Sequence, residues 1–192
     1  MEIVLFPDPL LRRKAERVDA FDAALAALAR EMFETMYRAR GVGLAAPQVG
    51  VSRSLFVSNP TGDPVEKGEE RVWVNPRILR RTGSVPGEEG CLSFPGIYAE
   101  VLRAESIVVE VADVTGKVER VELADFPARI VQHEGDHLEG VLFVDRLSPA
   151  DRIRVKPALA ALEERYKKGE KRMRPEAAEP EPAPGRARNA AL

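Results

Sequence analysis

The segment Gln132-His133-Glu134-Gly135-Asp136-His137-Leu138 carries the strongest structural signal in this chain. It holds both histidines of the 192 residues, four positions apart. Residues at this spacing lie on one face of a helix, so that two imidazoles there can bind one metal ion. Glu134 is placed to move protons at that ion. The alternative is a helix that carries two unrelated histidines, but the chain has no others. The segment therefore predicts a metal-binding helix.

A third ligand is needed, and Cys91 is the only cysteine. It lies in Glu89-Gly90-Cys91-Leu92-Ser93. A lone cysteine is more often a small buried hydrophobe than a ligand. Without a second cysteine, neither a disulfide within the chain nor a Cys-x-x-Cys zinc site can form. A two-histidine, one-cysteine set would leave a fourth position open for water or substrate, as catalytic sites do. Many metalloproteases with this helix motif use a downstream ligand instead, and the candidates on that scheme are Glu139, Asp145 and Glu163.

Three segments occur in a fixed order: Gly41-Val42-Gly43-Leu44-Ala45-Ala46-Pro47-Gln48, then the segment around Cys91, then the histidine segment. Together they resemble the peptide deformylase family. In that family the three motifs build one active site, which removes the formyl group from the N-terminal methionine of new polypeptides. The resemblance implies a catalytic domain over residues 1–168 and leaves residues 169–192 as a separate tail.

Composition agrees with a single globular domain. A chain of 192 residues with 44% hydrophobic residues can bury a sizeable core. A net charge of −2 gives no reason to expect DNA binding. No apolar run approaches the length that spans a membrane. Residues 1–7 lack the basic and apolar parts of a secretory signal. With a single cysteine, these features predict a cytoplasmic protein that binds no membrane.

Hydrophobic spacing and turn residues predict an α+β fold. Short antiparallel strands are expected to pack around a central metal-binding helix. One further helix is expected near the N-terminus and one near the C-terminus. The expected helices are Ala20–Arg40, begun by Asp19; Ala124–Leu138, begun by Asp125; and about 20 residues after Ser148-Pro149. The expected strands are Ser54–Ser58, Val72–Asn75 (ended by Pro76), Ile78–Thr82, Glu105–Ala112 and Val118–Leu123, the last two forming a hairpin.

The chain changes character after Gly169. The remaining residues are rich in Pro, Ala, Glu and Arg, and almost no large apolar side chain follows Met173. Such a segment cannot bury enough surface to offset its ordering entropy, so that we expect residues 169–192 to be disordered.

Each predicted catalytic role follows from residue type. His133 and His137 would supply neutral nitrogen ligands and Cys91 a thiolate. The metal would lower the pKa of its bound water, and Glu134 would take the water's proton and later pass one to the leaving amine. A developing oxyanion needs fixed donors, and the resemblance assigns this role to the Gln48 side chain and the Leu92 N–H. Alternatively, Gln48 is a loop amide that satisfies the backbone.

The substrate would lie on the ligand-bearing face of the helix. Phe126 and Ile130, with Val42 beside Gly43 in the first motif, are expected to form an apolar pocket for the methionine side chain; Phe126 in the protein core is the alternative. We expect the charge of Arg129 to reach water. By resemblance, Phe94-Pro95-Gly96-Ile97-Tyr98 would hold the peptide as an extended edge. Many bacterial relatives have an arginine in place of Tyr98, which argues against a charge contact from this position.

A network of Glu89, Asp136 and Arg103 is expected to orient Cys91 and one metal histidine. The alternative is three separate surface charges.

The donor set suits zinc, iron(II), nickel or cobalt. The resemblance implies one divalent ion per chain, Fe(II) in the cell, with Zn, Ni or Co in purified protein. It implies N-formyl-methionyl nascent peptides as substrates.

The last helix and the segment that follows it are basic, which suits transient docking on ribosomal RNA phosphates. Their basic residues are Lys156, Arg165, Lys167, Lys168, Lys171, Arg172 and Arg174. The alternative is a solvated helix face. Two other functions stay open: a different metal-dependent amidase or protease, and a non-catalytic metal- or peptide-binding module.

Overall fold

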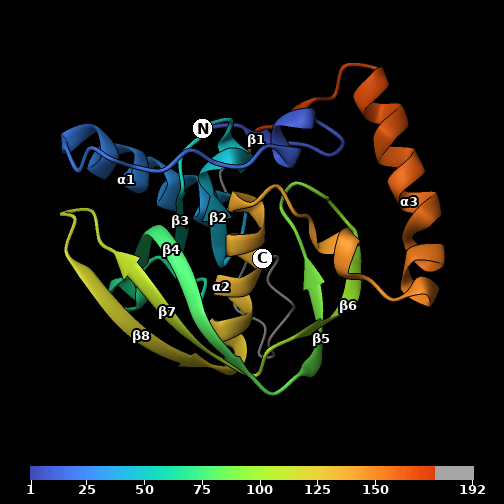
Figure 1. Ribbon diagram of the computed structural model, residues 1–192. Helices are drawn as coiled ribbons and strands as arrows, with labels where there is room; N and C mark the ends of the chain where they lie inside the picture. The colour runs from blue at the N-terminus through green and yellow to red at the C-terminus, as the bar shows by residue number, and fades with distance from the viewer. Residues whose placement is uncertain (176–192) are drawn as a thin grey trace.

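The computed structural model describes residues 1–175 (Figure 1). Helix α2 (Asp125–Leu138) occupies the centre, between a five-stranded antiparallel sheet and the separate hairpin β5–β6. Helix α1 (Ala23–Arg38) packs at one end of the sheet, and α3 (Pro149–Lys167) stands outside the hairpin. The prediction of an α+β fold around a central helix, with one helix from each end of the chain, is confirmed.

The five-stranded sheet supplies the wall behind α2. Its order is β2-β3-β4-β7-β8, all antiparallel. Side chains alternate between the faces of a strand, and Ile107, Val109 and Val111 of β7 are buried in one cluster with Ala128 and Val131 of α2. The bounds are β2 Gly43–Ala45, β3 Leu55–Ser58, β4 Arg71–Thr82, β7 Ser106–Ala112 and β8 Val118–Ala124.

Two smaller antiparallel pairs complete the strands. Strand β5 (Val85–Gly90) pairs with β6 (Tyr98–Arg103), and β1 (Ile3–Val4) pairs with β9 (Arg172–Met173). Short 3₁₀ helices cover Pro9–Arg12, Ala46–Val49, Lys67–Glu69 and Phe143–Arg146. In the part of the chain that the structure describes, no helix is both long and apolar enough to cross a bilayer.

The first helix begins later than predicted. Asp22, not Asp19, is its N-cap, and its carboxylate accepts a hydrogen bond of 2.9 Å from the Leu25 N–H. The other two helices begin where the sequence placed them. Ser148 caps α3 by accepting from the Asp151 N–H at 3.1 Å.

Pro76 does not end a strand. Residues 71–82 form one strand, β4, instead of the two expected. Its pairing with β7 shifts register between Val74 and Arg77, and Asn75 has a positive φ of 49°. A bulge leaves a residue outside the hydrogen-bond ladder, so that a proline there costs no ladder bond.

The hairpin β5–β6 was not predicted, because β5 contains one proline and two glycines. The expectation that residues 94–98 form an extended edge is wrong. The Phe94 N–H bonds to the Cys91 carbonyl at 2.8 Å, and the Ile97 N–H bonds to the Phe94 carbonyl at 3.1 Å, so that the segment makes turns. Phe94 and Ile97 are buried in the core, and only Tyr98 enters β6.

Disorder directly after Gly169 is also a wrong prediction. Arg172 and Met173 form β9 on β1, and Met173 packs against the core cluster that contains Ile3. Met173, a single large apolar residue that pairs with Ile3, is enough to hold this segment against the domain. Residues 176–192 of the predicted tail lie outside the described residues.

Candidate metal centre

The fold brings Cys91, His133 and His137 together from distant parts of the sequence. Cys91 directly follows the last residue of β5, and the histidines lie one turn apart on α2. The Cys91 Sγ lies 3.3 Å from His137 Nε2, and one possible ligand atom from each of the three residues lies within 4.8 Å of the others. All three are buried. The alternative ligands are engaged elsewhere or exposed: Glu139 pairs with Lys14, Asp145 accepts from the Leu142 N–H, and Glu163 faces solvent on α3.

Unpartnered polar atoms point to a bound cation. His133 Nε2, His137 Nδ1 and both carboxylate oxygens of Glu134 are buried without a hydrogen-bond partner among the described residues. Such atoms are costly unless something else satisfies them. Burial and then the neighbouring His133 hold the pKa of His137 well below its ordinary value, so that its ring is neutral, as a metal ligand must be. Two nitrogens and one sulfur fit a divalent transition metal.

The thiol of Cys91 also fits a cation site. Burial, followed by the negative charge of Glu134, raises its pKa. A nearby cation acts in the opposite direction and favours the thiolate. Gln48 donates from Nε2 to Cys91 Sγ at 3.4 Å and to Ser93 Oγ at 3.3 Å, while its Oε1 accepts from the Ala45 N–H at 2.8 Å. The backbone contact therefore fixes the amide that faces the sulfur.

Glu134 lies fully buried beside the ligands. Burial, and then the charge of Glu89, raises its pKa well above the ordinary value for a glutamate. Gly43 lies against it: a Cβ built on Gly43 would be 2.4 Å from Glu134 Oε1. A side chain at position 43 would displace the carboxylate, so that the first motif needs glycine there.

Glu89 connects the centre to a buried charge network. Its Oε2 accepts from His133 Nδ1 at 2.9 Å and from Arg103 at 2.9 Å, and its Oε1 accepts from Arg103 Nε at 2.8 Å. Arg103 also donates to Asp136 at 2.6 Å. Burial alone would raise the pKa of Glu89, but the hydrogen bonds from Arg103 and His133 outweigh it and lower that pKa. The contacts of the predicted carboxylate–arginine network are present, and they leave His133 Nε2 free for a metal.

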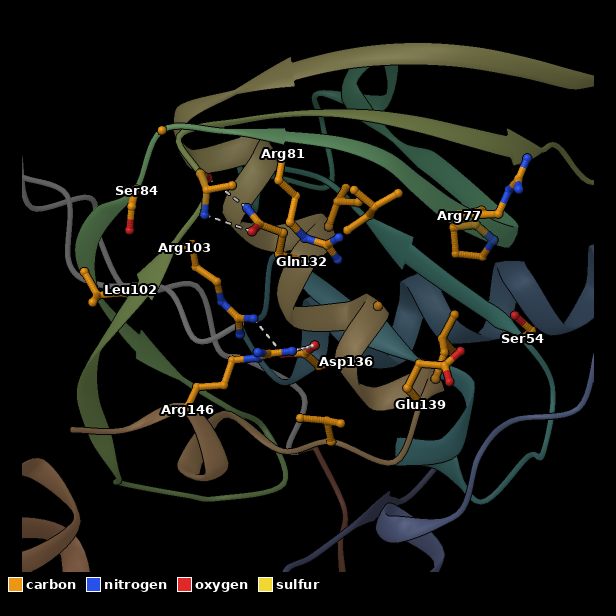
Figure 2. A pocket seen from close by; sticks show the side chains of 18 residues that line it. Ser54, Arg77, Arg81, Ser84, Leu102, Arg103, Gln132, Asp136, Glu139 and Arg146 are labelled. Atoms are coloured by element: carbon orange, nitrogen blue, oxygen red, sulfur yellow. Dashed lines mark hydrogen bonds and ion pairs between the residues drawn. The ribbon is translucent and has the colours of Figure 1, made fainter. Parts of the chain in front are cut away.

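Two arginines of this network were not predicted to belong to it. Arg146 pairs with Asp136 next to Arg103, as Figure 2 shows. Arg129 donates to Glu89 at 2.9 Å and is buried, so that the prediction of its charge in water is wrong. A cavity of about 550 Å³ adjoins Arg103, Asp136 and Arg146 (Figure 2), but none of the three candidate metal ligands lines it.

The expected substrate residues are brought together only in part. Val42 and Ile130 are buried against each other as a small cluster. Phe126 lies outside that cluster in the first turn of α2 and is 40% exposed, so that the alternative of a core residue is wrong. Tyr98 is half-exposed and its ring covers Gly90, where a Cβ would meet Tyr98 Cε1 at 2.4 Å. The Leu92 N–H has no acceptor among the described residues.

Two imidazoles and one cysteine sulfur are buried together, and Glu134 lies next to His133 on α2. This is the donor set of a mononuclear metal centre of the kind that metal-dependent hydrolases use. Residues 1–153 match the model of the polypeptide deformylase family, and the chain belongs to that family.

Relatives and solved structures agree with this assignment. Peptide deformylase 1B of Arabidopsis thaliana (chloroplastic/mitochondrial) is 50% identical over 167 residues, which are 86% of this chain and 61% of that protein. The chain thus spans about three fifths of that relative. Peptide deformylase of Thermus thermophilus is 49% identical over 156 residues, 76% of this chain and 81% of that protein.

The matches to crystal structures cover a larger share of the matched chains. A crystal structure of Arabidopsis thaliana peptide deformylase 1B with an inhibitor has a TM-score of 0.85 at 48% identity, and the match covers 92% of this chain and 97% of that one. The crystal structure of the Thermus thermophilus enzyme has a TM-score of 0.77 at 45% identity, covering 85% of this chain and 97% of that one.

Proposed function

We propose that this protein is a metal-dependent hydrolase that removes the formyl group from the N-terminal formyl-methionine of newly made polypeptides and releases formate. One observation carries the proposal: Cys91, His133 and His137 come together, with the unpartnered carboxylate of Glu134 next to His133, in a chain of the deformylase family.

Cys91, His133 and His137 would hold one divalent cation per chain. When bound, the cation supplies Lewis acidity, which makes hydroxide available from water near neutral pH. We propose Fe(II) in the cell and Zn, Ni or Co as substitutes in purified protein. A thiolate donates more charge than a third imidazole, which makes zinc a weak Lewis acid in this set. An anaerobically prepared iron form should therefore turn over faster than the zinc form, and equal rates would contradict this assignment.

Glu134 would be the proton carrier. Neither oxygen is hydrogen-bonded to another described residue, so that the carboxylate is free to accept a proton from water and to pass it to the leaving amine. Gly43 leaves the space that this carboxyl occupies.

Gln48 and Leu92 would stabilise the negative charge that develops on the formyl oxygen. The Gln48 amide is fixed by the Ala45 N–H and faces Cys91, and the Leu92 N–H follows Cys91 without an acceptor among the described residues. Donors that are already oriented stabilise an oxyanion without reorganisation.

The apolar wall for the methionine side chain would be formed by Val42 and Ile130, which are buried together. Phe126, exposed on the same helix, would cover the outer end of the side chain. Gly43 and Tyr98 would lie along the substrate backbone, since Gly43 adjoins Glu134 and Tyr98 covers the residue before Cys91.

The comparison of formyl-methionyl with acetyl-methionyl peptides tests the function. A site fitted to a formyl group should reject the extra methyl, so that formate release from the first should exceed acetate release from the second by orders of magnitude. Comparable rates would favour a broader amidase. If neither peptide is cleaved by protein loaded with metal under anaerobic conditions, a non-catalytic binding module is favoured.

Substrates of this kind emerge from the ribosome, and transient docking there through the last helix is part of the proposal. Of the basic residues of this helix and of the segment after it, Arg165, Lys167 and Arg174 pair with acids within the chain, which reduces the available charge. Binding to ribosomes that falls with added salt would support docking. We also propose residues 1–168 as the catalytic domain, onto which the chain folds back through β9. We propose the cytoplasm as its location; the named location of the Arabidopsis relative is chloroplastic/mitochondrial.

A further inference from the structure

Arg129 is a buried cation with an unusual set of partners. It lies one turn before His133 on α2, and its side chain is 9% exposed. Its NH1 donates to Glu89 Oε1 and to the Val101 carbonyl, both at 2.9 Å, and its NH2 donates to the Val85 carbonyl at 3.0 Å. One guanidinium on the helix therefore holds both strands of the β5–β6 hairpin.

The hairpin backbone is shaped for this side chain. Arg129 crosses β5 at Gly87, where a Cβ would lie 2.7 Å from its Cζ. Gly87 pairs with Val101, the residue whose carbonyl accepts from Arg129. A larger residue at position 87 would push the guanidinium away from all its acceptors, so that the glycine and the arginine form a matched pair.

Arg129 completes the hydrogen bonding of Glu89. Oε1 accepts from Arg103 and Arg129, and Oε2 accepts from Arg103 and His133. The two arginines approach from different elements, Arg103 from β6 and Arg129 from α2. Glu89 is two residues from Cys91 and touches His133, so that its position affects both the sulfur and one imidazole.

We propose that Arg129 is a positioning residue of the metal centre. It fixes β5, the strand directly before Cys91, against the helix that carries His133 and His137, and it sets the orientation of Glu89 toward the His133 ring. The inference rests on the proposed function, because it requires these three residues to bind a cation. It assigns no contact between Arg129 and the substrate.

The test uses full-length protein loaded with cobalt(II), with Arg129→Gln, Arg129→Lys and a matched control, Val109→Ala. Val109 is buried in the apolar cluster between the sheet and α2, and its side chain cannot form a hydrogen bond or ion pair with the charge network, so that we expect V109A to lower folding stability alone. Three quantities are measured: the cobalt concentration at half-saturation, the thiolate-to-cobalt absorption band, and the unfolding midpoint. We expect R129Q to weaken cobalt binding by about 10-fold and to shift the band. R129K, which keeps a charge at Glu89, should lie between R129Q and the parent.

The outcomes separate three cases. If R129Q lowers the unfolding midpoint as V109A does but keeps the parental cobalt affinity and band, Arg129 is only a structural link and the inference is wrong. If R129Q does not fold, R129K is used in its place. Cobalt affinity and an absorption band equal to those of the parent would overturn the inference, and weaker cobalt binding with a shifted band would support it. A parent protein that shows no thiolate-to-cobalt band overturns the proposed metal centre itself.

Discussion

Glu89 joins the candidate metal ligands to the buried charge network without being one of them. Two arginines and one imidazole donate to its two oxygens, and it is fully buried. Burying a charge is unfavourable unless it is paired and hydrogen-bonded. Here each carboxylate oxygen of Glu89 accepts two hydrogen bonds. The result is an anion of fixed position whose hydrogen bond sets which His133 nitrogen is free.

Replacing Arg103 with alanine should damage both stability and metal binding. Arg103 and Glu89 are 3% and 0% exposed, so that the loss leaves a poorly compensated buried carboxylate. Removing one partner of a buried pair costs about 3–5 kcal/mol of unfolding free energy, and loss of such a supporting contact weakens metal affinity about 10–100-fold. Denaturant unfolding and metal titration measure the two effects. Unchanged metal affinity and activity in R103A would argue against the network.

Glu134→Gln should abolish turnover and spare the metal. The amide keeps the shape of the side chain but cannot accept the water's proton, and a positioned acid or base contributes about 10²–10⁴-fold to rate. Formate release from a formyl-methionyl peptide gives the rate, and metal analysis of the same sample gives the occupancy. If E134Q keeps more than about a tenth of parental activity at equal occupancy, Glu134 is not the proton carrier.

Tyr37 gives the fold a specific response to alkaline pH. Burial, supported by the carboxylate of Glu70 and opposed by a hydrogen bond from Asn59, raises the pKa of Tyr37 from 10.0 to about 12. A raised folded-state pKa means that the stabilisation is complete below pH 10 and is lost as the pH rises toward 12. The stability advantage of the parent over Tyr37→Phe should therefore be constant up to pH 10 and then shrink. Urea unfolding at several pH values measures it; an advantage that grows above pH 10 would contradict the sign.

At the scale of elements, sequence patterns located the long, regular segments and missed those with mixed signals. The three helices and the β7–β8 hairpin carry strong spacing and turn residues and were placed within a few positions. Strand β5, with Pro86, Gly87 and Gly90, has the composition of a loop. Its pairing with β6 and the crossing by Arg129 make it a strand, and neither contact can be read from local sequence.

Strand β9 should stabilise the domain although it contains only two residues. It pairs with β1 and places Met173 against the core cluster that contains Ile3. We expect a chain ended after Glu170 to have an unfolding free energy about 1–2 kcal/mol lower than a chain ended after Pro175, because apolar burial is lost, and therefore a lower denaturant midpoint. Equal midpoints for the two truncations would show that β9 contributes nothing.

At the scale of the whole molecule, the site was more predictable than its surroundings. The ligand triad follows from residue chemistry and from three short motifs, and the fold brings its members together. The ion pairs of Arg129 with Glu89 and of Arg146 with Asp136 could not be predicted, because they join residues 40 and 10 positions apart, respectively, through side chains with many rotamers. Turns at residues 94–97 were missed because burial of Phe94 and Ile97, not local preference, decides their conformation.

The central claim is that one cation, held by Cys91, His133 and His137, performs deformylation. The most direct measurement is an anaerobic titration of metal-free protein with Fe(II), following formate release from a formyl-methionyl peptide. Activity should be absent at the start, rise in proportion to added iron and stop rising at one equivalent, while Cys91→Ala should stay inactive at the same iron concentrations. Full activity in metal-free protein, or an unchanged titration in C91A, would contradict the account.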